Sequence, residues 1–332
     1  MLEALLVAAF VAAVAFDFTN GFHDTANAIA TSVSTRALTP RAAIILSAVL
    51  NLAGAIVTVL IFGSKVSNTI SGLLTNPTVV AIVAALLAAI TWNLATWYLG
   101  LPSSSTHAFV GGLLGAGIAA AHGFGSIHWQ SLGATLIGLV ISPPIGFLLA
   151  AAVMIAVYHL ARGEPAKINR RLRQLQVLTA ALISYAHGSN DAQKSMAAMT
   201  LALLATGHLA HFAVPAWVVV LAAVAIGFGT WAGGWRIIRT LGWRIYKLEP
   251  ATGMGAQLAG ATTILAGSAI GLPVSTTHVV TGSVMGAGAP QRLSASGWSL
   301  GANIAVAWLA TIPAAAIVGW VAFAILHTAL PD

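Results

Sequence analysis

The sequence predicts an all-α integral membrane protein built from two repeats of inverted topology, each with a broken helix and a re-entrant helical hairpin. Of its 332 residues, 58% are hydrophobic and only 6% are charged, and the mean hydropathy is +0.92. A soluble globular surface needs more charge than this. Apolar runs of roughly 20 residues, the length of a membrane-spanning helix, recur along the chain, which favours helices over a β-barrel.

A duplicated segment is the evidence for two repeats. LPSSSTHAFVGGLLGAG at 101–117 returns as LPVSTTHVVTGSVMGAG at 272–288, with nine identities in seventeen positions. A looser pair joins NGFHDTANAIA, which contains Asp24, to HGSNDAQKSMA, which contains Asp191. The two pairs have offsets of 171 and 167 residues, about half the chain, so the duplicated unit is half of the protein.

In chain order, about ten hydrophobic segments are expected. Two of them should be interrupted, at 20–24 and at 187–191, where Gly and polar residues cluster. The segments are 3–34, 42–62, 79–99, 105–121, 132–158, 176–205, 214–234, 251–271, 276–288 and 298–328.

The segment 276–288 is too short, at about 1.5 Å per residue, to cross roughly 30 Å of hydrocarbon. We therefore expect 79–121 and 251–288 to form re-entrant hairpins, one entering from each side, with Pro-Ser-Thr tips near the midplane. Ten full crossings would place every loop outside the tips on the same side of the membrane as the hairpins do, so that alternative stays open.

Loop charge predicts the orientation in a plasma membrane. Basic residues cluster at 36–41, 162–173 and 236–247, whereas the loops 122–131 and 206–213 have no Lys or Arg. The positive-inside rule places the three clusters in the cytoplasm and both termini outside. The predicted organisation is a first repeat over 1–158, a basic cytoplasmic linker over 159–175 and a second repeat over 176–332. An odd number of crossings in each half inverts the second repeat.

Hydroxyl residues follow the proline of each duplicated tip. Pro ends one helix and Ser or Thr caps the next, and a buried helix start has unpaired N–H groups and about half a positive charge. Two such ends suit a small tetrahedral oxyanion. His107 and His278 follow the tips, either as donors at the site or as interior histidines bonded to a carbonyl. The candidate anion ligands at the tips are Ser103, Ser104, Ser105, Thr106, Ser275, Thr276 and Thr277.

Asp24 and Asp191 are the acids most clearly embedded in apolar sequence, and an intramembrane carboxylate is by default a functional residue. Oxygen-rich surroundings suit a hard cation or a proton. The two candidate coupling ions are therefore Na⁺, bound at Asp24 and Asp191, and H⁺. Asp17 is a further candidate cation ligand. The amides around the acids are Asn20 and Asn190, expected at the coupling ion, and Asn27 and Gln193, expected at the anion.

Lys194 breaks the symmetry of the repeat, because it aligns with Asn27. It is a candidate anion ligand, and pairing with an aspartate is the open alternative. Two bare carboxylates would repel a phosphate-like anion in a low dielectric. Cations or protons on them would attract it, so cation and anion should load together, which is symport by linkage.

These motifs resemble those of the inorganic phosphate transporter family. GFHDTANA at 21–28 and GSNDAQKS at 188–195 are similar to its duplicated Gly-x-Asn-Asp element, and 102–107 and 273–278 match its Pro-x-Ser-[Ser/Thr]-Thr-His element. The resemblance implies inverted repeats, phosphate held by the tip hydroxyls and coupling through the aspartates. His23 stands where the family usually has Asn, which leaves H⁺ as well as Na⁺ as the coupling ion. The short central loop resembles prokaryotic members.

The same residues allow other functions to be considered for this protein. A sulfate permease would keep the fold and change the tetrahedral anion. An intramembrane hydrolase is disfavoured because Gly-x-Ser-x-Gly and His-Glu-x-x-His are absent from the sequence, and an anion channel is disfavoured by the paired acids. We expect no enzyme activity and no cofactor beyond the coupling ion. The net charge is +7, but the basic residues lie in short loops beside helices and do not indicate nucleic-acid binding. The partners are phosphate, the cation and the bilayer, and homo-oligomerisation stays open.

Overall fold

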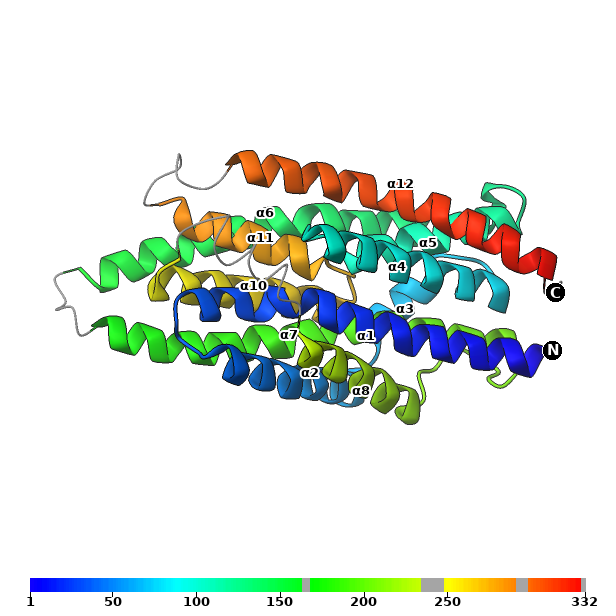
Figure 1. Cartoon of the computed structure of the whole chain (residues 1–332), viewed down its shortest axis with the longest axis horizontal. Coiled ribbons are helices and arrows are strands. Elements are labelled where there is room, and N and C mark those ends of the chain that lie inside the picture. The colour runs from blue at the N-terminus through cyan, green and yellow to red at the C-terminus, as the bar shows by residue number, and fades with distance from the viewer. Residues whose placement is uncertain (163–167, 234–247, 291–297, 330–332) are drawn as a thin grey trace.

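A computed structural model describes residues 1–162, 168–233, 248–290 and 298–329 (Figure 1). Within these ranges the chain consists of helices and connecting loops, apart from one isolated antiparallel bridge between Leu74 and Ile127. The fold is therefore all-α, as the sequence predicts. Five helical stretches are long and apolar enough to cross a membrane by length and composition, which are Leu2–Ser34, Pro40–Phe62, Val79–Leu99, Trp129–Leu160 and Ala305–Ala329.

Each of the ten predicted hydrophobic segments corresponds to one helix. The short helix α3 is not predicted, because seven residues between two apolar segments carry little periodic signal. The helices are α1 (Leu2–Ser34), α2 (Pro40–Phe62), α3 (Lys65–Ser71), α4 (Val79–Leu99), α5 (Ser105–Ala120), α6 (Trp129–Leu160), α7 (Ile168–Ala205), α8 (Ala216–Ala232), α10 (Pro250–Ile270), α11 (Thr276–Gly288) and α12 (Trp298–Ala329), with a 3₁₀ turn η1 (Phe124–Ser126).

The expected interruptions at 20–24 and 187–191 are corrected by the structure, because α1 and α7 continue through both positions. The glycines there serve helix packing. A Cβ on Gly21 would collide with the carbonyl of Ile226 on α8, and one on Gly188 would collide with the carbonyl of Asn51 on α2. Close helix approach therefore explains these glycines, and the polar residues beside them bond sideways to neighbouring helices.

The two expected hairpins are α4–α5 and α10–α11. The first helix of each ends at a glycine in the left-handed region, Gly100 (φ 67°) and Gly271 (φ 78°), a conformation that favours glycine. Figure 1 shows the hairpins in opposite halves of the long axis. Their tips touch, because Thr106 Oγ1 donates to the carbonyl of Val274 at 3.2 Å. The helix starts of α5 and α11 are therefore brought together deep inside the molecule.

The sequence halves interlock. α1 packs on α8 and α2 on α7, and the second helix of each hairpin packs on the last helix of the other half, α5 on α12 and α11 on α6. Glycines permit these contacts too, because a Cβ on Gly282 would lie 2.6 Å from the carbonyl oxygen of Pro143. In Figure 1, α1 and α7 start at opposite ends of the molecule. Inverted repeats require this arrangement, and their symmetry and boundaries stay predictions.

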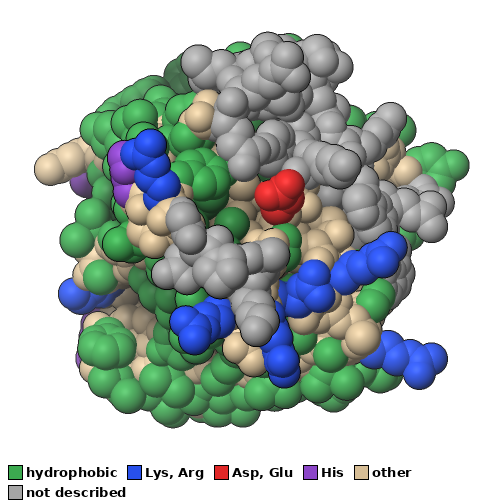
Figure 2. Space-filling model, turned by 90° about the vertical axis from the view of Figure 1, so that its left-hand side faces the viewer, with side chains coloured by type: hydrophobic (Ala, Val, Ile, Leu, Met, Phe, Trp, Pro, Cys, Tyr) green, Lys and Arg blue, Asp and Glu red, His purple; other side chains and the backbone are tan. Residues whose placement is uncertain are grey.

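The two ends of the molecule differ in charge. Both termini lie at one end (Figure 1), where His208 of the α7–α8 loop is 3.6 Å from Glu3. Figure 2 shows Lys and Arg side chains gathered on the opposite end. The third basic cluster (Arg236, Arg239, Arg244 and Lys247) and part of the predicted linker (163–167) lie outside the described residues. The exposed arginines of the described loops and helix ends are Arg36, Arg41, Arg162, Arg170, Arg171 and Arg173.

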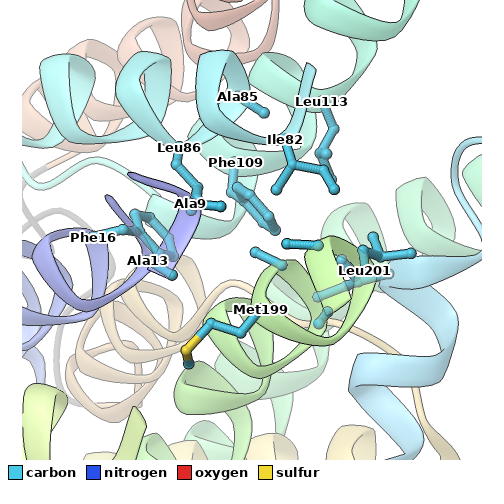
Figure 3. Packing of buried hydrophobic residues seen from close by; sticks show 14 of the residues in the cluster. Ala9, Ala13, Phe16, Ile82, Ala85, Leu86, Phe109, Leu113, Met199 and Leu201 are labelled. Atoms are coloured by element: carbon cyan, nitrogen blue, oxygen red, sulfur yellow. The ribbon is translucent and has the colours of Figure 1, made fainter. Parts of the chain in front are cut away.

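Two apolar clusters lie on either side of the buried acids of α1 and α7. One contains Phe16 and Phe109, whose rings stack at 5.2 Å, together with residues of α4 and the end of α7 (Figure 3). The other contains Ile29 of α1 and Ile183 of α7. Asp24 lies between Phe16 and Ile29 in α1, so the buried polar residues occupy the layer between the clusters.

Candidate anion and cation site

The two predicted acids come from different halves and meet at the tip of the first hairpin. Asp24 on α1 and Asp191 on α7 are 1% and 0% exposed. The Ser105 hydroxyl lies 3.0 Å from Asp24 Oδ2 and 3.5 Å from Asp191 Oδ2. His187 Nε2 lies 3.9 and 3.5 Å from the same two oxygens. The structure thus brings together residues that are 167 positions apart in the sequence.

Asp24 accepts hydrogen bonds from both hairpin tips. Ser105 donates to its Oδ2 at 3.0 Å and Thr277 to its Oδ1 at 3.2 Å. His23 Nδ1 lies 2.7 Å from Oδ1, and when Asp24 is ionised this nitrogen is the one that carries the proton. Asn27 in turn donates to the Thr277 hydroxyl at 2.8 Å. Two of the hydroxyl donors expected at an anion, Ser105 and Thr277, are therefore directed at a carboxylate in this structure.

His23 extends this network to another predicted anion ligand. Its Nε2 lies 3.2 Å from Thr96 Oγ1, and Thr96 Oγ1 lies 2.8 Å from Ser103 Oγ. Ser103 is therefore linked to Asp24 through two intermediate side chains.

Asp191 is paired with a buried lysine. Lys194, 1% exposed, donates to Asp191 Oδ2 at 2.7 Å. It also donates to the hydroxyls of Ser105 at 2.8 Å and Thr106 at 3.3 Å. Asn20 donates to the same carboxylate oxygen at 3.3 Å. Of the two roles that the sequence leaves open for Lys194, the structure shows pairing with the aspartate, and it adds contacts to the first tip.

Other predicted residues have different partners. Gln193 accepts from the backbone N–H groups of Val66 at 3.0 Å and Ser67 at 3.2 Å, so it caps the start of α3 and does not join the tips. Asn190 donates to Ser268 at 2.9 Å. The sequence could not reveal the role of Gln193, because the short helix α3 is not predicted.

Ser104 and Ser275 are the helix caps of the tips. Ser104 Oγ accepts from the His107 N–H at 3.1 Å, and Ser275 Oγ accepts from the His278 N–H at 3.3 Å. Thr276 is buried at the start of α11. The ring centroids of His107 and His278 are 4.4 Å apart, and the ring of His278 stacks on that of Trp308 with a centroid distance of 3.7 Å. These two histidines therefore join the hairpin tips to each other and to α12.

His187 begins the second motif, HGSNDAQKSMA, but is not among the predicted site residues. Its Nδ1 lies 2.8 Å from Asn51 Oδ1 on α2, which directs Nε2 towards both acids. The signal in the sequence is its spacing, because a residue four positions before Asp191 lies on the same face of a helix. Among the described residues, Asp24, His187 and Asp191 form a group whose ligand atoms all lie within 4.8 Å of one another.

Several oxygens near the acids can accept a hard cation. In the described part of the chain, Asp191 Oδ1 has no hydrogen-bond partner, nor have the amide oxygens of Asn20 and Asn27 or Asp17 Oδ1. Buried oxygens without partners are costly in a folded protein, and oxygen ligands are those that hard cations prefer. These oxygens therefore fit a cation such as Na⁺, bound beside an anion at the tip hydroxyls. Protons on the carboxylates would reduce the same buried negative charge.

Comparison with known proteins relates the chain to phosphate transporters. A model of the phosphate transporter family matches residues 20–319. The chain is 46% identical over 319 residues to a probable low-affinity inorganic phosphate transporter of Rhizobium meliloti, covering 95% of this chain and 94% of the relative. It is 44% identical over 334 residues to a protein of the same description from Bacillus subtilis, covering 98% of each. A solved structure described as the sodium-dependent phosphate transporter superposes with a TM-score of 0.88 at 25% identity, covering 98% of this chain and all of that one.

Proposed function

The chain belongs to the phosphate transporter family, and we propose that it imports inorganic phosphate across a prokaryotic plasma membrane by symport with a cation, H⁺ or Na⁺. One observation carries this proposal. Ser105 and Thr277, one from each hairpin tip, both donate to Asp24, so the donors for an anion and the ligand for a cation form one hydrogen-bonded unit. The sodium-dependent relative supports Na⁺, and His23 beside Asp24 supports H⁺.

The hydroxyl groups provide the coupling step. Each hydroxyl has one proton to donate, and the protons of Ser105 and Thr277 are engaged by Asp24. A cation or proton on Asp24 weakens it as an acceptor. The hydroxyls can then rotate towards a phosphate oxygen, so cation binding prepares the anion site.

Electrostatics acts in the same direction. Two unit charges 4 Å apart interact by about 4 kcal/mol at an effective dielectric constant of 20. Phosphate entering beside an uncompensated Asp24 would meet a repulsion of that order, and neutralising the carboxylate removes it. Anion and cation affinity are therefore linked, and the linkage is reciprocal.

We place the basic end of the molecule in the cytoplasm, since basic loops stay on that side. Both termini are then outside. The hairpins approach the site from opposite ends, so in this proposal α4–α5 opens the outer path and α10–α11 opens the inner path in turn.

The test uses purified protein in proteoliposomes, with labelled phosphate and with Na⁺ and pH gradients imposed independently. The wild type should accumulate phosphate against its gradient, and unlabelled sulfate should compete poorly. Asp24→Asn should bind phosphate without cation dependence and lose gradient-driven accumulation, because the amide is uncharged whether or not the ion is present. The monodispersity of the variant in detergent controls for folding. Wild-type accumulation by a folded Asp24→Asn variant would make Asp24 a bystander.

A further inference from the structure

Lys194 uses all of its hydrogen-bonding capacity inside the site. An ammonium group has three donors and no acceptor, and its nitrogen lies 2.7 Å from Asp191 Oδ2, 2.8 Å from Ser105 Oγ and 3.3 Å from Thr106 Oγ1. Three donors thus meet three oxygens, and none is left for an anion. The side chain is 1% exposed, so this charge is a fixed part of the buried site.

The position of the first repeat that aligns with Lys194 has an uncharged side chain. Asn27 aligns with Lys194 and donates to Thr277 of the second tip at 2.8 Å. Lys194 donates to Thr106, which is the residue of the first tip that aligns with Thr277. The two positions therefore make matching contacts across the repeat, an amide in one case and an ammonium in the other.

The consequence differs at the two acids. Among the described residues, the hydrogen-bond partners of Asp24 are two hydroxyls and a histidine, and none of them is a Lys or Arg, so its charge is open to compensation by a mobile cation. Asp191 has a covalently attached cation three residues along the same helix, and this ammonium donates to Oδ2 and offsets the charge of the whole carboxylate, including the unpartnered Oδ1. Both partners of this pair are buried, so each would be left uncompensated if the other were removed.

We propose that the Lys194 ammonium is a tethered counter-ion that replaces a transported cation at Asp191, so that only the Asp24 side of the site loads an exchangeable cation. This inference rests on the proposed symport. A tethered charge neutralises its acid but does not cross the membrane, so it adds no driving force. The second half of the site can then accept phosphate whatever the gradient, and each phosphate requires one cation fewer.

The experiment measures how steeply phosphate accumulation depends on the imposed cation gradient. Proteoliposomes at zero membrane potential receive a series of Na⁺ gradients, and in separate samples a series of pH gradients. Lys194→Asn recreates the amide of the first repeat. A tenfold cation gradient should then raise the limiting phosphate accumulation of this variant by about another tenfold over the wild type, because one more cation travels with each phosphate.

Two further variants complete the test. Lys194→Arg keeps the charge and should keep the wild-type dependence. Asn27→Lys places a tethered cation in the first repeat and should lower the dependence by one cation, so it tests the proposal even if Lys194→Asn fails to fold. An unchanged gradient dependence in a folded Lys194→Asn or Asn27→Lys variant would overturn the proposal. A weaker phosphate affinity of Lys194→Asn at every cation concentration, with unchanged gradient dependence, would identify Lys194 as an anion ligand. Failure of the wild type to accumulate phosphate would refute the symport itself.

Discussion

The hydroxyl of Ser105 contacts both acids and Lys194, and its removal is the sharpest test of the anion assignment. Ser105→Ala deletes a donor that lies 3.0 Å from Asp24 Oδ2 and an acceptor that lies 2.8 Å from Lys194 Nζ. If this hydroxyl turns to phosphate in the loaded state, the variant loses one hydrogen bond to a charged ligand. Such a bond contributes about 1.5–3 kcal/mol, which corresponds to roughly 10- to 150-fold in apparent phosphate affinity.

The size of the effect should depend on the cation. At saturating cation, Asp24 no longer competes for the hydroxyl proton and the full loss should appear. At low cation the wild-type hydroxyl is still held by Asp24, so the wild type and the variant should differ less. The measurement is the KM for phosphate uptake into proteoliposomes at several cation concentrations.

Ser104→Ala is the matched control, one residue away on the same tip. Its hydroxyl caps α5 by accepting from the His107 N–H at 3.1 Å, so its loss should lower stability by about 0.5–2 kcal/mol and change the KM for phosphate less than Ser105→Ala does. A wild-type KM in Ser105→Ala, or equal KM changes in the two variants, would refute the reasoning.

Two further predictions concern packing and orientation. Gly282→Ala puts a Cβ 2.6 Å from the carbonyl oxygen of Pro143 and should lower stability by about 1–3 kcal/mol, seen as a lower Tm in detergent. Gly133→Ala, with nothing within 4 Å of the added carbon, should not lower the Tm, and equal losses would contradict the packing argument. The sequence has no cysteine, so single cysteines report orientation without background. Gly125→Cys and His208→Cys should react with an impermeant thiol reagent from outside and Asn169→Cys only from inside, and labelling of Asn169→Cys from outside would reverse the orientation.

The predicted helix breaks show where local sequence is misleading. Gly beside Asn and Asp is typical of a turn or an unwound helix, and this pattern occurs at 20–24 and 187–191. The structure uses Gly21 and Gly188 for close contact with α8 and α2 instead. The partner helices lie far away in the sequence, so no local pattern could separate a break from a tight crossing.

The roles of individual polar residues also depend on distant partners. Gln193 is predicted as an anion ligand, and in the structure its side-chain oxygen accepts from the backbone at the start of α3. His187 lies in the second motif without a predicted role, yet its contact with Asn51 directs its ring towards both acids. A side chain on a buried helix can serve several neighbours, and only the packing of those neighbours selects one.

The sequence by itself determined the features that follow from composition and repetition. It predicted an all-α membrane protein, ten of its helices, two hairpins and the two acids, because apolar length, proline-hydroxyl tips and duplication are properties of the chain alone. Only the tertiary structure decided that both tips donate to Asp24 and that Lys194 donates to Asp191. These contacts join residues of α1, α5, α7 and α11, and they exist because the two halves interlock and bring the buried polar groups of distant segments into one layer.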